Sequence, residues 1–181
     1  MQTIDKDTAR RNVLDHFKYM EEESVRAQLD ENRSDLVLIL ENVAYDINVG
    51  GLIRTFNIMN GRKIYIVGRK QWDRRGAVGT HNYCYVEYAQ EMSDVIRTLK
   101  AEGYTIVASE LSPVAEPLHH FAFDRKTAII MGAEATGITE ETLAMADLDL
   151  YIPQRGSARS MNVTAAGSIM MWEYTRQMGL F

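Results

Sequence analysis

Residues 36–54 of this chain read LVLILENVAYDINVGGLIR. The first five are apolar, which is typical of a strand buried on both faces of a sheet. A polar loop follows, and a helix then begins, with Asn48 well placed to cap it. Arg54 falls between one and two turns into that helix. Taken alone, this segment is best explained by a loop, a helix cap and a surface arginine.

The same alternation of short apolar runs and helical stretches continues from Asp35 onward. Runs of about 4–6 residues, rich in Val, Ile, Leu or Tyr, predict strands at residues 36–40, 63–67, 85–88, 105–108, 128–131 and 148–152. Helices are expected at residues 49–60, 92–102, 140–146 and 161–178. This order predicts an α/β fold, with a mostly parallel sheet flanked by helices on both faces.

The N-terminal part has a different composition. Residues 5–31 are dense in charged side chains, and Val13, Phe17 and Met20 fall close to a helical spacing. We therefore expect residues 1–34 to form an N-terminal helical extension that packs on a domain of residues 35–181. With 181 residues, 46% of them hydrophobic, the chain is long enough for one domain with a real core.

Several classes of protein are disfavoured. The longest apolar runs are far shorter than the roughly 20 residues of a membrane span. The polar N-terminus does not look like a signal peptide, so a cytoplasmic location without membrane contact is expected. The sequence contains no GxGxxG, GxxxxGK[ST] or GxSxG motif, which argues against ordinary dinucleotide-binding proteins, P-loop proteins and serine hydrolases. No metal is expected, because the histidines lack ligand spacing. Cys84 is expected to be a core thiol, and His119 and His120 a solvated pair.

Two further segments place polar residues after predicted strands. In residues 128–138, AIIMGAEATGI, the strand ends at Gly132, where a ligand or another backbone can approach closely. Glu134 then stands at the carboxyl end of a strand, where open α/β sheets bind ligands. In residues 150–167, LYIPQRGSARSMNVTAAG, a strand leads through a polar loop to a helix that Ser160 or Asn162 can cap. The small residues 165–167 allow close packing against another element or a second subunit.

Together and in this order, the three segments resemble the signature motifs of the SpoU/TrmH-like methyltransferases of the SPOUT superfamily. The first motif is an asparagine followed six residues later by an arginine, matched by Asn48 and Arg54. The second is a strand ending in Gly-x-Glu-x-x-Gly, matched by Gly132, Glu134 and Gly137.

The third motif is Ile-Pro, a loop and then Ser-Leu/Met-Asn-Val-Ser. Its matches are Ile152, Pro153, Ser160, Met161, Asn162 and Val163. Thr164 replaces the commoner serine and keeps the hydroxyl. The resemblance covers about residues 35 to 178 of the sequence.

The resemblance implies a fold and a reaction. The fold would contain a deep trefoil knot made by the C-terminal segment, and the protein would be a homodimer whose active sites are completed across the interface. The activity would be methylation of RNA ribose 2′-hydroxyls with S-adenosylmethionine as donor. The implied cofactor contacts are Ala108, Gly132, Ile152, Ser160 and Met161.

Roles for the motif side chains follow from that chemistry. The site must align a weakly nucleophilic hydroxyl with the methyl group and stabilise the developing negative charge. Because a guanidinium stays protonated in proteins, we expect Arg54 to clamp the neighbouring phosphate and stabilise the alkoxide, while the proton passes to phosphate or water. We expect Asn48, Glu134, Ser160 and Asn162 to position Arg54 and the ribose.

The net charge of −5 argues against non-specific coating of nucleic acid, but a local basic patch can still bind RNA. The candidate RNA-phosphate residues are Arg69, Lys70, Arg74, Arg75, Arg155 and Arg159. Transfer RNA is favoured as substrate over 23S ribosomal RNA. Many ribosomal members carry a separate N-terminal RNA-binding domain, and only about 34 residues precede the first strand here. A non-catalytic homologue that binds S-adenosylmethionine and RNA is the other alternative.

Overall fold

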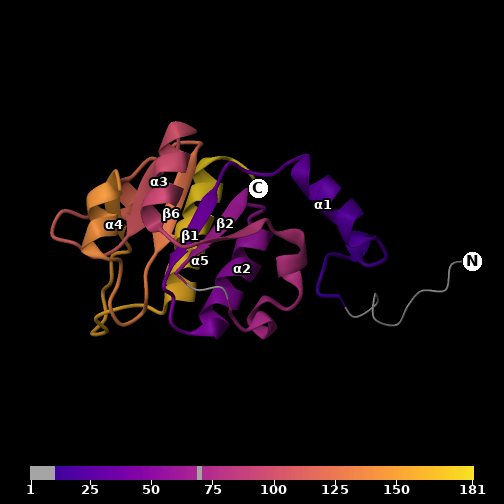
Figure 1. Cartoon of the computed structure of the whole chain (residues 1–181), viewed down its shortest axis with the longest axis horizontal. Coiled ribbons are helices and arrows are strands. Elements are labelled where there is room, and N and C mark those ends of the chain that lie inside the picture. The colour runs from indigo at the N-terminus through magenta and orange to yellow at the C-terminus, as the bar shows by residue number, and fades with distance from the viewer. Residues whose placement is uncertain (1–10, 69–70) are drawn as a thin grey trace, which may run out of the picture.

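The computed structural model describes residues 11–68 and 71–181, which fold around a seven-stranded sheet (Figure 1). The strands are β1 (Val37–Glu41), β2 (Lys63–Val67), β3 (Val86–Ala89), β4 (Thr105–Ser109), β5 (Glu116–Pro117), β6 (Thr127–Met131) and β7 (Leu148–Tyr151). Their order across the sheet is β3-β2-β1-β6-β4-β7-β5, and all neighbouring pairs are parallel. The predicted α/β class, with a parallel sheet flanked by helices, is confirmed. Strand β5 was missed because two residues, one of them proline, leave no alternating pattern.

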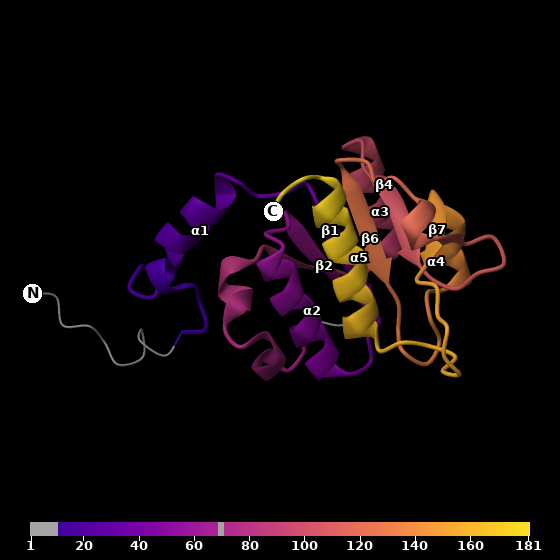
Figure 2. The ribbon, with the colours of Figure 1, turned by 180° about the vertical axis from the view of Figure 1, so that it is seen from behind.

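Helices cover both faces of the sheet. Helices α2 (Asp46–Ile58) and α5 (Val163–Gln177) lie side by side on one face (Figure 2), and α3 (Met92–Ala101) and α4 (Glu140–Met145) cover the other. Adjacent residues of β1 point to opposite faces, so Leu38 packs in the core beneath α2 and α5, while Ile39 packs beneath α3. The predicted bounds of these helices differ from the observed ones by at most three residues.

Helices α2 and α5 approach each other closely because glycines lie between them. A Cβ atom on Gly167 would come within 2.4 Å of Leu52 Cδ2, and one on Gly51 within 2.8 Å of Thr164 Cγ2. The hydroxyls of Thr55 and Ser168 add a hydrogen bond of 3.1 Å between the helices. Of the small residues 165–167, for which close packing was predicted, Gly167 packs against α2, whereas Ala165 is exposed and Ala166 lines a cavity. This contact brings the starts of the two helices together.

The described part of the N-terminal extension is helical but not one continuous helix. The chain forms a short 3-10 helix, η2 (Asp15–Phe17), and then α1 (Glu22–Asp30). Between them Glu21 is extended, with φ −63° and ψ 148°. Acidic residues are stabilised at a helix N-terminus by the helix dipole, so Glu22 and Glu23 favour the start of a new helix there.

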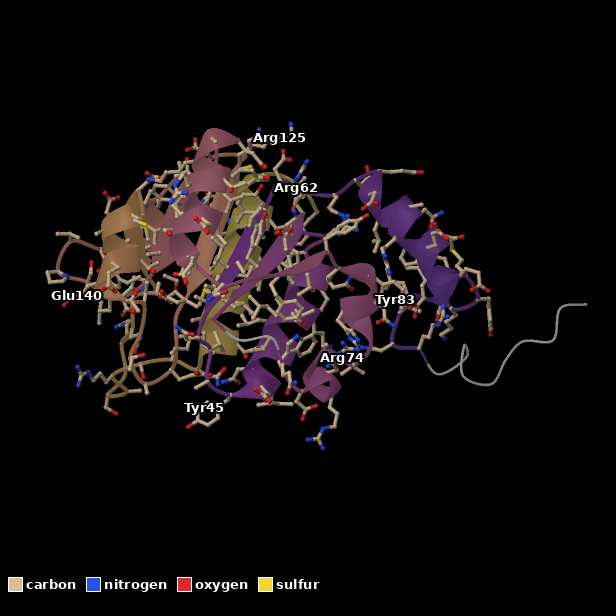
Figure 3. The ribbon with its side chains drawn as sticks, viewed as in Figure 1. Tyr45, Arg62, Arg74, Tyr83, Arg125 and Glu140 are labelled. Carbon is tan, nitrogen blue, oxygen red and sulfur yellow. The ribbon has the colours of Figure 1, made fainter. Side chains whose placement is uncertain are left out.

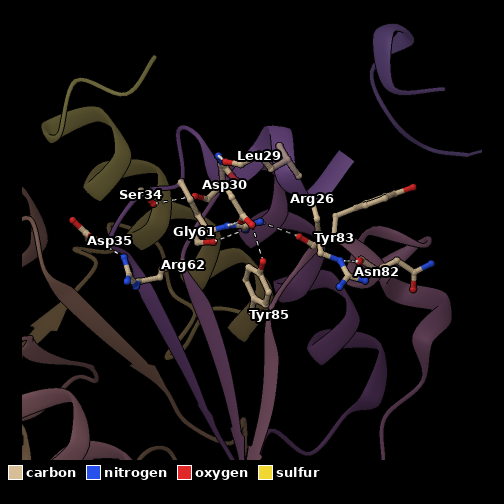
Figure 4. A network of polar contacts seen from close by, with 12 residues as sticks. Arg26, Leu29, Asp30, Ser34, Asp35, Gly61, Arg62, Asn82, Tyr83 and Tyr85 are labelled. Carbon is tan, nitrogen blue, oxygen red and sulfur yellow. Dashed lines mark hydrogen bonds and ion pairs between the residues drawn. The ribbon is translucent and has the colours of Figure 1, made fainter. Parts of the chain in front are cut away.

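Helix α1 stands to one side of the sheet and is attached mainly by polar contacts (Figure 4). Of its residues only Val25 is buried. The Tyr85 hydroxyl donates to Asp30 Oδ2 (2.7 Å), and Arg33 Nη1 donates to the Gly61 carbonyl (3.0 Å). Arg26 Nε donates to the carbonyl of Asn82 (2.8 Å), in the 3-10 helix η4 (Thr80–Tyr83). The extension is thus anchored on the η4 side of the domain.

Among the described residues, no helix combines the length and apolar composition needed to cross a bilayer. The remaining short helices are η3 (Arg74–Ala77) and η5 (Leu118–His120).

Candidate active site

The three motif segments meet beyond the carboxyl ends of the central strands. The carboxylate of Glu134, in the turn after β6, accepts hydrogen bonds from the Ala44 N–H (2.9 Å) and from the side-chain amide of Asn48. The amide oxygen of Asn48 in turn accepts from Asn162 Nδ2 (3.3 Å). One residue of each motif therefore belongs to a single hydrogen-bonded series, the Glu134–Asn48–Asn162 chain. Parallel strands bring these residues together because their carboxyl ends share one edge of the sheet.

Asn48 was predicted to cap helix α2, and this prediction is wrong. The helix begins at Asp46, and Tyr45 occupies the N-cap position. An acidic residue in the first turn suits the helix dipole, which favours the earlier start. Asn48 therefore lies within the first turn, where its side chain is free to bridge Glu134 and Asn162.

Asn162 has the predicted capping role at helix α5. Its Oδ1 accepts from the N–H groups of Thr164 (2.9 Å) and Ala165 (3.3 Å), while its amide group donates to Asn48. The Thr164 hydroxyl also lies against Asn48, 3.2 Å from its carbonyl and 3.3 Å from its Oδ1. Ser160 is exposed, and its side chain makes no hydrogen bond with the described residues.

The surroundings of Glu134 keep its carboxyl group ionised. Burial alone would raise its pKa, but hydrogen bonds from Asn48 and from the backbone N–H groups of Glu134, Ala44 and Tyr45 lower the pKa below the usual 4.5. At neutral pH Glu134 is therefore a fixed negative charge and an acceptor, rather than a proton donor.

Two carboxylates that the sequence reasoning missed hold the rest of the turn after β6. Buried Glu41, the last residue of β1, accepts from the N–H (3.0 Å) and hydroxyl (2.9 Å) of Thr139. Glu110, just after β4, accepts from the Ile138 N–H (3.0 Å). Their position at the carboxyl ends of strands could have identified both. Together with Glu134 they fix the turn to its neighbouring segments.

A cavity of about 930 Å³ opens between the loops that follow β4, β6 and β7. Its walls come from residues 109–113, 131–138, 150–152, 154, 156, 158–161 and 163, together with Leu143 and Ala166. Of the predicted cofactor contacts, Gly132, Ile152, Ser160 and Met161 line it. Ala108 is buried in β4 and is not in the described lining, although Ser109 beside it is. Because Glu134 also lines this cavity, it adjoins the Glu134–Asn48–Asn162 chain.

Arg54 does not join this chain within one copy of the protein. Its side chain is exposed on α2, and it makes no hydrogen bond or ion pair with residues 11–68 or 71–181. Ile47 and Ile58, seven residues before and four after it, lie on the same side of the helix. Both isoleucines are exposed, so Arg54 lies in an apolar surface.

The predicted RNA-phosphate residues occupy two places. Arg155 and Arg159 are exposed in the loop between β7 and α5, and Arg159 lines the cavity. Arg74 is exposed in η3 and has no ion pair with the described residues. Arg75 is paired with Asp73, with Nη2 and Oδ2 2.5 Å apart. The other two predicted residues, Arg69 and Lys70, lie outside the described part.

Cys84, His119 and His120 lie where the sequence predicted. Cys84 is buried, and this burial raises the pKa of its thiol to about 11, so it is an unreactive core group at neutral pH. His119 and His120 are both exposed. In the part of the chain that the structure describes, no three His, Cys, Asp or Glu residues are grouped to hold a metal ion.

Residues 35–172 match the model of the SpoU rRNA Methylase family. The chain belongs to this family. The match contains all three motifs and the Glu134–Asn48–Asn162 chain, so the resemblance seen in the sequence is confirmed.

Individual relatives agree with membership of the SpoU family. The chain is 33% identical over 152 residues to the tRNA (guanosine(18)-2′-O)-methyltransferase of Escherichia coli strain K12, covering 82% of this chain and 66% of that protein. It thus spans slightly less than two thirds of that relative. The crystal structure of an A. aeolicus TrmH/SpoU tRNA modifying enzyme superposes with a TM-score of 0.80 at 25% identity, over 88% of this chain and 84% of that one. An AdoMet-bound rRNA methyltransferase from Sinorhizobium meliloti superposes with a TM-score of 0.73 at 26% identity, over 82% and 59% of the two chains.

Replacing Gly132 by alanine should damage the cavity of this SpoU-family chain. The added Cβ would lie 2.4 Å from the backbone carbon of Gly137, and backbone cannot move aside as a side chain can. We expect a loss of about 1–3 kcal/mol in unfolding free energy, and at least about tenfold weaker binding of S-adenosylmethionine. Gly156→Ala is the matched control, because it also lines the cavity but its Cβ would meet nothing within 4 Å. Thermal melts and calorimetric titration test this, and equal behaviour of the two variants would contradict it.

Proposed function

We propose that this protein transfers a methyl group from S-adenosylmethionine to a ribose 2′-hydroxyl of RNA, with transfer RNA as the substrate. The Glu134–Asn48–Asn162 chain carries the proposal, because it joins all three motifs beside the cavity. A motif preserved only by chance would not be expected to form one hydrogen-bonded series.

The cavity suits S-adenosylmethionine. Its volume lies within the range of roughly 300–1,000 Å³ common for small-molecule sites. Small residues such as Gly132, Ala133 and Ser160 leave backbone groups of the cavity wall accessible to a ligand. Ile152 and Met161 offer apolar surface to an adenine ring. When bound, the cofactor supplies an electrophilic methyl group.

The protein's own residues would orient the ribose and stabilise charge. Ionised Glu134 holds the Asn48 amide, and Asn48 and Asn162 hold each other, so these groups need little rearrangement when RNA binds. Arg54 would clamp the phosphate beside the target ribose and stabilise the oxygen as it loses its proton. The proton would pass to phosphate or water, because a guanidinium is a poor base.

We further propose a homodimer formed through the outer face of α2 and α5. This face includes Ile58 on α2, and Ile169 and Trp172 on α5, with Trp172 48% exposed and in ring contact with Phe181. Exposed apolar patches of this kind mark interaction sites. Because Arg54 lies in this face and not in the Glu134–Asn48–Asn162 chain, dimerisation would present it to the partner's site.

Trp172→Glu should dissociate this dimer. A buried tryptophan is often the main contributor to an interface, so we expect the dimer Kd to rise at least about 30-fold. Methyl transfer should fall at low protein concentration and recover as the concentration rises. Leu14→Glu is the control, because it places the same charge on another exposed apolar residue, far along the chain. Sedimentation velocity measures the result, and a Trp172→Glu protein that remains dimeric would contradict the assignment.

Support for transfer RNA comes from the relatives. The Escherichia coli relative is named for guanosine 18 of transfer RNA, but the part of it that this chain does not match could contribute to its choice of nucleotide. We therefore propose transfer RNA without assigning the position. Ribosomal RNA and a non-catalytic role are the alternatives.

Methyl transfer from labelled S-adenosylmethionine to separated, unmodified transfer and ribosomal RNA tests the proposal. We expect label in transfer RNA as an alkali-resistant dinucleotide, which is diagnostic of ribose methylation. Label only in ribosomal RNA would overturn the substrate, and cofactor binding without any transfer would favour the non-catalytic homologue. Mapping the resistant dinucleotide would give the position.

The trefoil knot is also part of the proposal. Family membership supports it, as does the convergence of the segments after β4, β6 and β7 on one cavity. Pulling the ends of a single molecule apart should give an extended length shorter than that of an unknotted chain. The division into an extension of residues 1–34 and a domain of residues 35–181, and the cytoplasmic location, stay predictions.

A further inference from the structure

An aromatic side chain with a fixed backbone and a free ring lies beside the proposed catalytic chain. Tyr45 is 63% exposed (Figure 3), and its hydroxyl makes no hydrogen bond with the described residues. Its backbone is held on both sides. The N–H group of the preceding residue, Ala44, donates to the Glu134 carboxylate (2.9 Å), and the Tyr45 carbonyl accepts from the N–H groups of Asn48 (2.9 Å) and Val49 (3.3 Å).

These bonds fix the backbone from which the Tyr45 ring projects relative to the site. Glu134 and Asn48, which anchor its backbone, are two of the three members of the Glu134–Asn48–Asn162 chain. A tyrosine needed only for packing would be expected in a core, where its large ring is removed from water. This ring contributes to no core and does not line the cofactor cavity among the described residues.

The segment that contains Tyr45 also contacts the 3-10 helix η3. Ile47, two residues after Tyr45, packs against Gly76 of η3: a Cβ atom on Gly76 would lie 2.7 Å from the Ile47 carbonyl oxygen. Gly76 belongs to η3, as does the exposed Arg74, which has no ion pair with the residues that the structure describes. The segment 45–47 therefore contacts both the Glu134–Asn48–Asn162 chain and η3, the short helix that carries Arg74.

We propose that the Tyr45 ring stacks on a nucleobase of the RNA, at or next to the nucleotide whose ribose is methylated. The inference rests on the proposed function and adds a base-binding residue to it. Proteins hold unstacked RNA bases on aromatic rings and their phosphates on arginines, and an exposed ring and an exposed arginine are carried here by two segments in contact. Stacking accepts any base, so Tyr45 provides affinity and placement rather than base identity.

Tyr45→Ala tests the proposal. Stacking on one base typically contributes about 5- to 150-fold in affinity, so the Kd for a fluorescently labelled transfer RNA transcript and the KM for RNA should rise by that factor. The Kd for S-adenosylmethionine should not change. Tyr45→Phe keeps the ring face and should restore most of the RNA affinity. Tyr19→Ala is the matched control, because Tyr19 is 62% exposed in the N-terminal extension.

The outcomes are separable. A Tyr45→Ala enzyme with unchanged RNA affinity and KM overturns the stacking role, as does a Tyr45→Phe variant as weak as Tyr45→Ala. A Tyr45→Ala protein that sediments as a monomer, when the wild type is a dimer, also overturns it and assigns the ring to contact between copies. If the wild type transfers no methyl group to RNA, the proposed function fails, and the binding measurement still decides on Tyr45.

Discussion

Arg54→Ala is expected to lower kcat for ribose methylation by about 10²- to 10³-fold, the loss typical when one group that stabilises transition-state charge is removed. Arg54 is exposed and bonded to no described residue, so its removal should leave the fold intact. S-adenosylmethionine binding should stay close to wild type, because Arg54 does not line the cavity. Arg54→Lys keeps the charge but loses the planar fork, and should have an intermediate rate.

Single-turnover methyl transfer measures this effect without interference from product release. Arg97→Ala is the control, because Arg97 is an exposed arginine in α3, on the opposite face of the sheet. If Arg54→Ala turns over at the wild-type rate, Arg54 has no part in the reaction. If Arg54→Lys is as active as the wild type while Arg54→Ala is not, a positive charge is sufficient for activity, and bidentate binding of phosphate by Arg54 is not required.

Glu134→Ala is expected to lower kcat by about 10²-fold, because the groups that Glu134 holds in place would shift. Its carboxylate accepts from the Ala44 N–H and the Asn48 amide, and both would lose their partner. The Asn48 amide is partly buried, and leaving such a donor unsatisfied costs about 1–3 kcal/mol, so stability should fall as well. Glu140→Ala, at the exposed start of α4 (Figure 3), is the matched control. Wild-type rates in Glu134→Ala would remove the Glu134–Asn48–Asn162 chain from the mechanism.

The same residue predicts a pH dependence of stability. The pKa of Glu134 is lower in the folded protein than its usual 4.5, so the folded state favours the ionised form. The contribution of Glu134 to the free energy of unfolding is fully present above pH 4.5 and is lost as the pH falls through the lower pKa of the folded state. The stability difference between wild type and Glu134→Ala should therefore be constant near neutral pH and shrink below about pH 4.5. Urea unfolding across this range tests the sign, and a difference that grows on acidification would contradict it.

Much of the fold could be predicted from local pattern. The apolar run before Glu41 and the helix cap at Asn162 depend on interactions within a few residues, which a sequence displays directly. The misplaced role of Asn48 has the opposite origin. A small polar residue near a helix start looks like a cap, and its real partner, Glu134, lies 86 positions away.

The sequence by itself determined the α/β class, the helix positions and the three motifs. The spacing of apolar residues, the glycines and the helix caps all act between residues that are close together in the chain. Only the tertiary structure decided which side chains meet. The order of the parallel strands placed Glu41, Glu110 and Glu134 around one turn, and glycine contacts between α2 and α5 set Asn48 against Asn162. It also left Arg54 and Tyr45 exposed. These results depend on packing between residues far apart in the chain, and that information is not present in any local pattern.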